Sequence, residues 1–297
     1  MKTQLSPALL TECRLMGQRL AEAVKLPLLR KIWRGASGDF AGAGTGNSME
    51  FQDHRAYQAG DDPRHLNWQA YARTGQFTMK VFRQEVRPMV DVVCDVSASQ
   101  FLHEAKTRRV LELLYFCVTA AEKAGAAAKI FLLNGTQSAL LTSELLASPN
   151  WPDRLPDHQP AGLLGEMPSV ARLPFRSQSL RIFLSDLLYP GSPDTVLGPL
   201  SASGGRGLIF VPFSATEASV DWEGNHEFVE VESGQRQVRR VTPTVLRRYH
   251  EAYQRHFDLW KTAGRRHGIP MARVAAEGDL LTTVQAEAVL LGVVEAG

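Results

Sequence analysis

The chain has 297 residues, of which 44% are hydrophobic and 22% are charged, and its formal net charge is +2. This length provides an ample core for one large domain or two smaller ones without disulfide or metal staples. The nearly balanced charge excludes a general electrostatic attraction to nucleic acid or to a membrane surface.

The compartment signals favour the cytoplasm. The first ten residues lack the long apolar core of a signal peptide, and no run approaches the roughly 20 apolar residues that a transmembrane helix needs. The three cysteines, Cys13, Cys94 and Cys117, form no C-x-x-C pair, as expected in a reducing compartment. We therefore expect a cytoplasmic protein without a membrane span.

The N-terminal part combines helix and strand patterns. Residues 7–33 have a helical spacing of apolar residues and predict one or two helices, broken near Pro27. Residues 35–47 are rich in Gly, Ala and Ser and predict a flexible loop. Residues 48–53 and 80–87 favour short or exposed strands.

A dense group of charged and aromatic residues lies between these two expected strands. Residues 60–63, Gly-Asp-Asp-Pro, have turn chemistry. We expect the charged side chains around this turn to pair with one another and to fix its geometry. They are Arg55, Asp61, Asp62, Arg64 and Arg73. Two aromatic residues, Tyr57 and Trp68, are expected to pack beneath them.

Polar residues follow the most strand-like run of the sequence at the point where that run ends. Residues 90–94 are apolar except for one aspartate, as in a strand buried on both faces, and residues 101–123 predict a helix. The connection carries Asp95, Ser97 and Ser99 in a D-x-S-x-S pattern. Three oxygen side chains at the carboxyl end of a strand suit one hard cation. The alternative is that the two serines cap the following helix without a metal.

Strand and helix patterns alternate in the rest of the chain. Strands are expected at 128–133, 138–142, 180–186, 208–213 and 271–275, helices at 162–173, 192–202, 243–267 and 281–294, and a hairpin from 227–231 and 235–241. This alternation predicts an α/β fold with a doubly wound, mostly parallel sheet. We expect residues 88–297 to form this domain and residues 1–87 to form an α+β extension packed on it.

Several enzyme classes lack their sequence patterns. The chain has neither a G-x-x-x-x-G-K-[ST] loop nor a G-x-S-x-G elbow. A phosphatase of the haloacid dehalogenase type needs an acid two residues after its first aspartate, and that position is Ser97 here. We therefore expect no enzymatic activity.

The loop pattern resembles that of the von Willebrand factor type A fold, a Rossmann-like fold. The D-x-S-x-S loop and a later Ser185-Asp186 pair after a strand carry the resemblance. In that fold such loops build a metal-ion-dependent adhesion site. The resemblance implies that Asp95, Ser97, Ser99 and Asp186 hold a divalent cation such as Mg²⁺.

One residue of that adhesion site is missing from the sequence. The fold's second metal loop supplies a threonine, but no threonine occurs between Thr142 and Thr195. Either Ser169 or Ser177 takes its place, or the site is incomplete.

More specifically, the chain is similar to the bacterial family catalogued as domain of unknown function 58. The motifs that carry this similarity are Glu50-Phe51, Arg55-x-Tyr57, Gly60-Asp-Asp-Pro-Arg64, Asn67-Trp68 and Ala72-Arg73. Many relatives have Asp where this chain has Asn67.

The family resemblance implies a non-enzymatic protein-interaction module. Its implied partner is a MoxR-type AAA+ ATPase, with a role in protein maturation or stress response. The nearly balanced charge, rather than the resemblance, predicts no binding to nucleic acid. The alternative is a metal-assisted hydrolase that uses Asp95 and Asp186.

Overall fold

The computed structural model describes residues 5–28, 32–35, 49–85, 87–156, 167–231 and 234–297. These residues form two compact units. The larger unit combines residues 1–27 with residues 89–297, and the smaller unit comprises residues 28–88. The first helix therefore belongs with the large sheet, whereas the sequence assigned it to an extension ending at residue 87. How the two units pack against each other stays a prediction.

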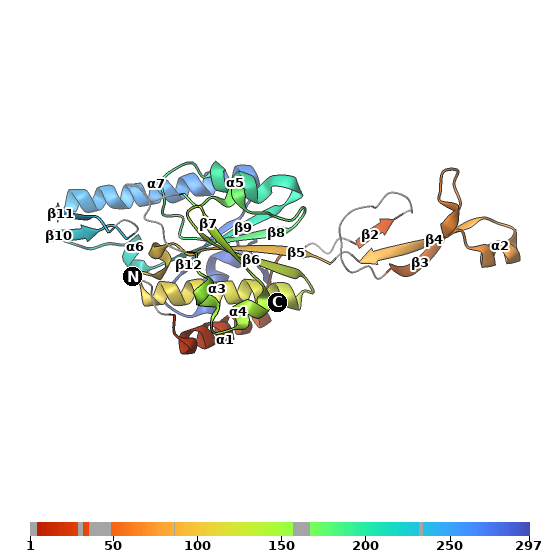
Figure 1. The fold of residues 1–297 in the computed structure, drawn as a ribbon. Coiled ribbons are helices and arrows are strands. Elements are labelled where there is room, and N and C mark those ends of the chain that lie inside the picture. The colour runs from red at the N-terminus through yellow and green to blue at the C-terminus, as the bar shows by residue number, and fades with distance from the viewer. Residues whose placement is uncertain (1–4, 29–31, 36–48, 86, 157–166, 232–233) are drawn as a thin grey trace. The chain divides into compact units, whose positions relative to one another are not determined.

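A six-stranded sheet forms the centre of the larger unit (Figure 1). Its strands are β5 (Met89–Asp95), β6 (Ala127–Asn134), β7 (Gln137–Leu141), β8 (Leu180–Leu184), β9 (Arg206–Phe213) and β12 (Met271–Ala275). Their order is β12-β9-β8-β5-β6-β7, and only β7 runs antiparallel to its neighbour. The predicted α/β fold with a mostly parallel sheet is confirmed. Because the chain order reverses at β5, the carboxyl ends of β5 and β8 open side by side.

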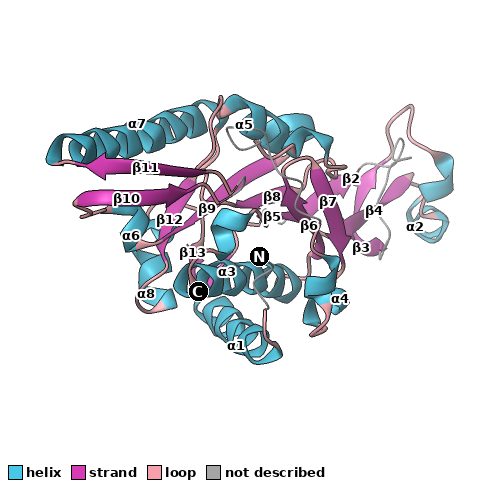
Figure 2. Ribbon diagram, turned by 60° about the vertical axis from the view of Figure 1, so that its left-hand side comes forward, coloured by secondary structure: helices cyan, strands magenta, loops and turns pink. Residues whose placement is uncertain are grey.

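Helices cover both faces of this sheet (Figures 1 and 2). One face carries α3 (Glu104–Lys123), α1 (Pro7–Ala23), α4 (Ser143–Ala147) and α8 (Leu280–Val284), and the other carries α5 (Asp194–Ser201) and α7 (Pro243–His267). Helix α3 is buried along most of its length because it lies between the sheet and α1. Apolar residues therefore occupy more than one face of α3, unlike the single apolar stripe of a surface helix.

Helix α7 begins and ends where the sequence predicts. The hydroxyl of Thr242 accepts a hydrogen bond from the Val245 N–H, and Gly268 ends the helix with a left-handed φ of 63°. Its buried aromatic side includes Phe257 and Trp260, and the Trp260 ring packs edge-on against Tyr189 at 5.8 Å between centroids. This apolar contact anchors α7 on its face of the sheet.

The smaller unit is an antiparallel sheet with a helical tip. Strands β2 (Ile32–Gly35), β4 (Thr78–Glu85) and β3 (Met49–Ala56) lie side by side in that order, and α2 (Trp68–Thr74) follows a 3₁₀ turn at Pro63–His65. Most of the expected ion pairing is present, because Arg55 contacts Asp61 at 2.5 Å and Arg64 contacts Asp62 at 2.6 Å. Arg73 instead donates to the Gln69 carbonyl of its own helix at 3.4 Å.

The aromatic residues of this turn do not pack beneath it as predicted. Tyr57 is 38% exposed and Trp68 is 58% exposed. The Trp68 ring meets the edge of Tyr71, which itself stacks on Phe77 at 4.4 Å between centroids, and the Tyr57 ring lies 6.2 Å from that of Phe77. The predicted burial is wrong, because these two rings belong to a partly exposed aromatic group with Tyr71 and Phe77.

Other elements depart from the expected boundaries. The N-terminal helix ends at Ala23 and is followed by short strands, β1 (Val24–Lys25) and β2, where the helical pattern was extended to residue 33. Strand β1 pairs with β13 (Glu295–Ala296), and the expected hairpin forms from β10 (Gly224–Val229) and β11 (Arg236–Val241). Residues 36–47 of the expected loop and 162–166 of the expected helix lie outside the described residues. Residues 167–173 of that expected helix form no α-helix and contain a 3₁₀ turn at Val170–Arg172.

Candidate functional site

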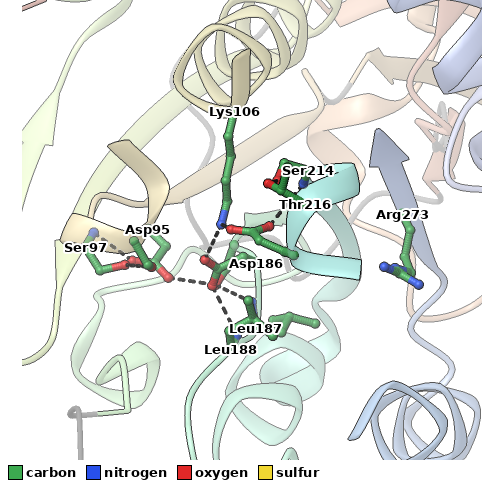
Figure 3. Close-up of polar contacts among 12 residues, drawn as sticks. Asp95, Ser97, Lys106, Asp186, Leu187, Leu188, Ser214, Thr216 and Arg273 are labelled. Atoms are coloured by element: carbon green, nitrogen blue, oxygen red, sulfur yellow. Dashed lines mark hydrogen bonds and ion pairs between the residues drawn. The ribbon is translucent and has the colours of Figure 1, made fainter. Parts of the chain in front are cut away.

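Two loops at the carboxyl edge of the sheet bring the predicted acidic residues together (Figure 3). Asp95 is the last residue of β5, and Asp186 follows β8 by two residues. The strands are in register from Val90 and Leu180 to Cys94 and Leu184, so Asp95 lies beside Ser185. The Ser185 hydroxyl donates a hydrogen bond of 2.7 Å to Asp95 Oδ2. The two loops are thereby joined through buried polar side chains.

The first loop is folded around Asp95. The Ser97 N–H donates to Asp95 Oδ1 at 3.0 Å, and the Ser97 and Ser99 hydroxyl oxygens lie 3.2 Å apart. Ser97 precedes a 3₁₀ turn (Ala98–Phe101), but its side chain makes no capping hydrogen bond there. Ser97 therefore does not cap the following turn, contrary to the alternative of a capping role.

A buried lysine of α3 contacts the second loop and has no counterpart among the residues predicted from the sequence. Lys106, in the first turn of α3, has a fully buried side chain, and its Nζ lies 2.8 Å from Asp186 Oδ2 and 2.5 Å from Glu217 Oε1. Figure 3 shows its ammonium reaching from the helix to the Asp186 carboxylate. Glu217 belongs to α6 (Ala215–Ala218), which follows β9, and also accepts from the Ser214 N–H at 3.0 Å.

The helical spacing of α3 contains a signal for this lysine. Lys106 lies at positions i−4, i−8 and i−11 from Val110, Leu114 and Cys117, which are all buried. A lysine on the buried side of a helix must find an anionic partner in the interior. The helical periodicity therefore indicates that a partner is needed, but not which carboxylates provide it.

The electrostatics of this edge disfavour the charge of Asp95 and favour that of Lys106. Burial, and next the negative charge of Asp186, raise the pKa of Asp95 to about 6, although hydrogen bonds from Ser185 and Ser97 oppose this. Burial alone would lower the pKa of Lys106, but the carboxylates of Asp186 and Glu217 outweigh burial and raise it. Lys106 is therefore a cation at neutral pH.

The donor set only partly fits the divalent cation that the resemblance implies. Asp95, Ser97 and Ser99 provide oxygens close together, which suits Mg²⁺. Asp186 does not fit, because its Oδ2 contacts the Lys106 ammonium and its Oδ1 accepts from the Leu188 N–H at 3.1 Å. Among the described residues, no three or more His, Cys, Asp or Glu side chains form a metal-binding group.

The two candidates for the missing threonine lie at different ends of the sheet. Ser177 precedes β8 and is therefore at the amino end of that strand. Ser169 donates its N–H to the Gly135 carbonyl at 2.9 Å, in the turn that follows β6. Only Ser169 is on the edge that carries Asp95.

A shallow apolar hollow of 420 Å³ adjoins the second loop. Its lining comes from the loop after Asp186 and from α7, and consists of Leu188, Tyr189, Pro190, Tyr249, Ala252, Tyr253 and His256. Tyr249 Oη donates to the Glu217 carbonyl at 2.6 Å, and His256 Nε2 lies 2.7 Å from the Leu187 carbonyl oxygen. These bonds tie α7 to both loops that hold Lys106.

Comparison with known proteins identifies the family. The family model described as "Protein of unknown function DUF58" matches residues 53–258, which is more than half of the chain. The chain belongs to the DUF58 family. No curated protein matches this DUF58 chain.

Within the described residues, no helix combines the length and apolarity that crossing a bilayer requires.

Two solved structures from Bacteroides are distantly similar to the DUF58 chain. An aerotolerance-related membrane protein from Bacteroides fragilis is 12% identical, with a TM-score of 0.35, and the match covers 67% of this chain and 96% of the other. The conserved hypothetical protein BatB from Bacteroides thetaiotaomicron is 12% identical, with a TM-score of 0.34, and the match covers 69% and 98%. Scores this low establish no common fold.

Proposed function

We propose that this DUF58 chain is a non-enzymatic protein-interaction module with a von Willebrand factor type A-like core. Its docking surface is the carboxyl edge of the six-stranded sheet, around Asp95 and Asp186. One observation supports this most directly. The loops at that edge are held by buried polar contacts, yet they present the exposed apolar side chains of Leu102, at 54%, and Leu188, at 41%. Such residues on a fixed surface are suited to binding a partner.

The partner follows from the family resemblance. We propose a MoxR-type AAA+ ATPase, with a role in protein maturation or stress response. The apolar hollow beside Leu188 provides a place for an apolar side chain of that partner.

The resemblance also implies that Mg²⁺ assists this docking. Of the implied ligands, Asp95, Ser97 and Ser99 suit the ion, whereas Asp186 already contacts Lys106. Docking as proposed here does not require the ion. Binding measured in EDTA therefore tests the role of the ion separately from the location of the docking surface.

Binding of the purified ATPase to surface variants tests the docking surface. Replacing both exposed residues, Leu102→Asp with Leu188→Asp, is expected to weaken binding at least about tenfold, equivalent to roughly 1.4 kcal/mol. Leu15→Asp is the matched control, because Leu15 is 50% exposed and lies on α1, away from this edge. Isothermal titration calorimetry measures the affinities. Equal affinity of the double variant and the wild type would show that the partner docks elsewhere.

Variants of Ser97 and Ser99 test whether the hydroxyls of the first loop take part in ion-dependent docking. If Mg²⁺ bridges to the partner, EDTA and the double change Ser97→Ala with Ser99→Ala lower the affinity equally, and Ser177→Ala at the opposite edge does not. Binding that is unchanged in EDTA removes the ion from the docking mechanism.

The hydrolase alternative makes a different prediction. Phosphatase or nuclease turnover with Mg²⁺ or Mn²⁺, lost in Asp95→Asn, would support it. We expect no turnover in such a screen, because Asp186 is neutralised by Lys106 and is not free to hold a catalytic ion.

A further inference from the structure

The buried ammonium of Lys106 is the centre of the carboxyl edge. Its side chain has no exposed surface, and its two carboxylate partners are at most 16% exposed. A buried lysine is tolerated only when anionic partners compensate for its lost hydration. Lys106 has two such partners, on the loops that follow β8 and β9. The ammonium therefore connects α3 to two neighbouring loops of the sheet edge.

The position of this ammonium conflicts with a divalent ion on the same carboxylate. An ion bound to Asp186 would lie close to a charge of the same sign, 2.8 Å from Asp186 Oδ2. Two cations this close to one carboxylate in a partly buried site repel each other. The other oxygen of Asp186 already accepts a backbone N–H. Lys106 and a divalent ion are therefore alternatives at this carboxylate.

We propose that Lys106 is the internal cation of this edge and replaces the divalent ion that the resemblance implies. The ammonium neutralises Asp186 and Glu217 and holds the loops after β8 and β9 in place. The edge then keeps its shape in the absence of metal. This proposal concerns the site itself and does not depend on the partner proposed above.

A titration of the wild-type protein tests this directly. We expect no binding of Mg²⁺ or Mn²⁺ by isothermal titration calorimetry, and the same Tm in EDTA as in either ion. Stoichiometric Mn²⁺ binding to the wild type that is lost in Ser97→Ala with Ser99→Ala would overturn the proposal. This measurement decides the question even if the lysine variants fail to fold.

Removal of the ammonium should create the affinity that the wild type lacks. Lys106→Met has nearly the same length but no charge, and leaves the carboxylates of Asp186 and Glu217 without a cation. We expect its Tm to fall in EDTA and to rise again by at least about 2–4 °C in saturating Mg²⁺ or Mn²⁺. A folded Lys106→Met variant whose Tm does not respond to either ion would contradict the proposal.

A second lysine on the same helix provides the control. Lys123 is 41% exposed and pairs with Glu22 at the surface. Lys123→Met is expected to behave as the wild type, with neither a large loss of Tm nor a response to the ions. An ion response in this variant equal to that of Lys106→Met would show that the effect is not specific to the buried site.

Discussion

Asp95 has both of its carboxylate oxygens hydrogen-bonded, yet its surroundings disfavour its charge. It is 2% exposed and lies near the negative charge of Asp186. Burial and this neighbour raise its pKa from 3.8 to about 6. Between these values the folded protein holds a proton that the unfolded chain has released. The free energy of unfolding therefore falls as the pH rises through this window and is level above it.

Asp95→Asn should remove this cost. The amide oxygen still accepts from the Ser97 N–H, and the amide nitrogen can donate to the Ser185 hydroxyl. In metal-free buffer at pH 7 we expect the variant to be more stable than the wild type by on the order of 2–3 kcal/mol, and less dependent on pH between about 4 and 6. Urea unfolding across this pH range measures the effect. The exposed Asp153→Asn serves as control, and an Asp95→Asn protein that is less stable than the wild type at pH 7 would contradict the prediction.

Residue patterns indicated part of this site and missed the rest. Asp95 and Ser97 are recognisable because they follow the strand-like run at 90–94 within three residues, and Asp186 because it ends the expected strand at 180–186. Helical spacing shows that Lys106 needs a partner, but nothing local in the sequence pairs Lys106 with Asp186 or Glu217, which lie in other elements. Ser177 was a reasonable substitute for threonine by composition, but it lies at the amino end of β8.

At the scale of elements, α1 and α3 approach each other closely at a single glycine. A Cβ on Gly17 would lie 2.7 Å from the Phe116 nitrogen and 2.8 Å from the Glu112 carbonyl oxygen. Both are backbone atoms of α3 and cannot move aside without shifting the helix. The helical spacing of residues 7–23 predicts an apolar stripe. The packing of α1 on α3 shows in addition that position 17 must be a glycine.

Gly17→Ala is therefore expected to destabilise the larger unit. The added methyl group forces α1 away from α3, and we expect a loss of about 1–3 kcal/mol in the free energy of unfolding. Gly198→Ala is the matched control, because Gly198 lies within α5 and its Cβ would meet no atom of another element within 4 Å. That change should alter the free energy of unfolding by less than about 1 kcal/mol, because the gain in helix propensity is opposed by Pro199, which disfavours a helical residue with a Cβ before it. Urea midpoints that fall equally in both variants would show that close packing is not the cause.

At the scale of the whole molecule, the chain enters the large sheet unit twice. Residues 1–27 and 89–297 form one unit, and residues 28–88 form another between them. Sequence patterns did not indicate this, because an N-terminal helix next to a glycine-rich segment suggests an extension. The packing of α1 on α3 assigns the helix to the large unit instead.

This division predicts the outcome of two deletions. Replacing residues 28–88 by a long Gly/Ser linker should leave the larger unit folded, with a single cooperative thermal transition. Deleting residues 1–88 instead removes α1 and exposes the side of α3 that it covers, so we expect a large drop in Tm or an insoluble protein. Circular dichroism and calorimetry distinguish these outcomes. Loss of folding in the first variant would contradict the assignment of two units.

Elements whose causes lie within a few residues of one another are predictable from the sequence. These include the apolar strand before Asp95, the α7 helix with its Thr242 cap and Gly268 end, and the parallel α/β order. The tertiary structure alone decided which charges meet, because Lys106 reaches partners 80 and 111 residues away in the chain. Burial removes water from such a group, so its protonation state depends on the side chains that the fold places beside it.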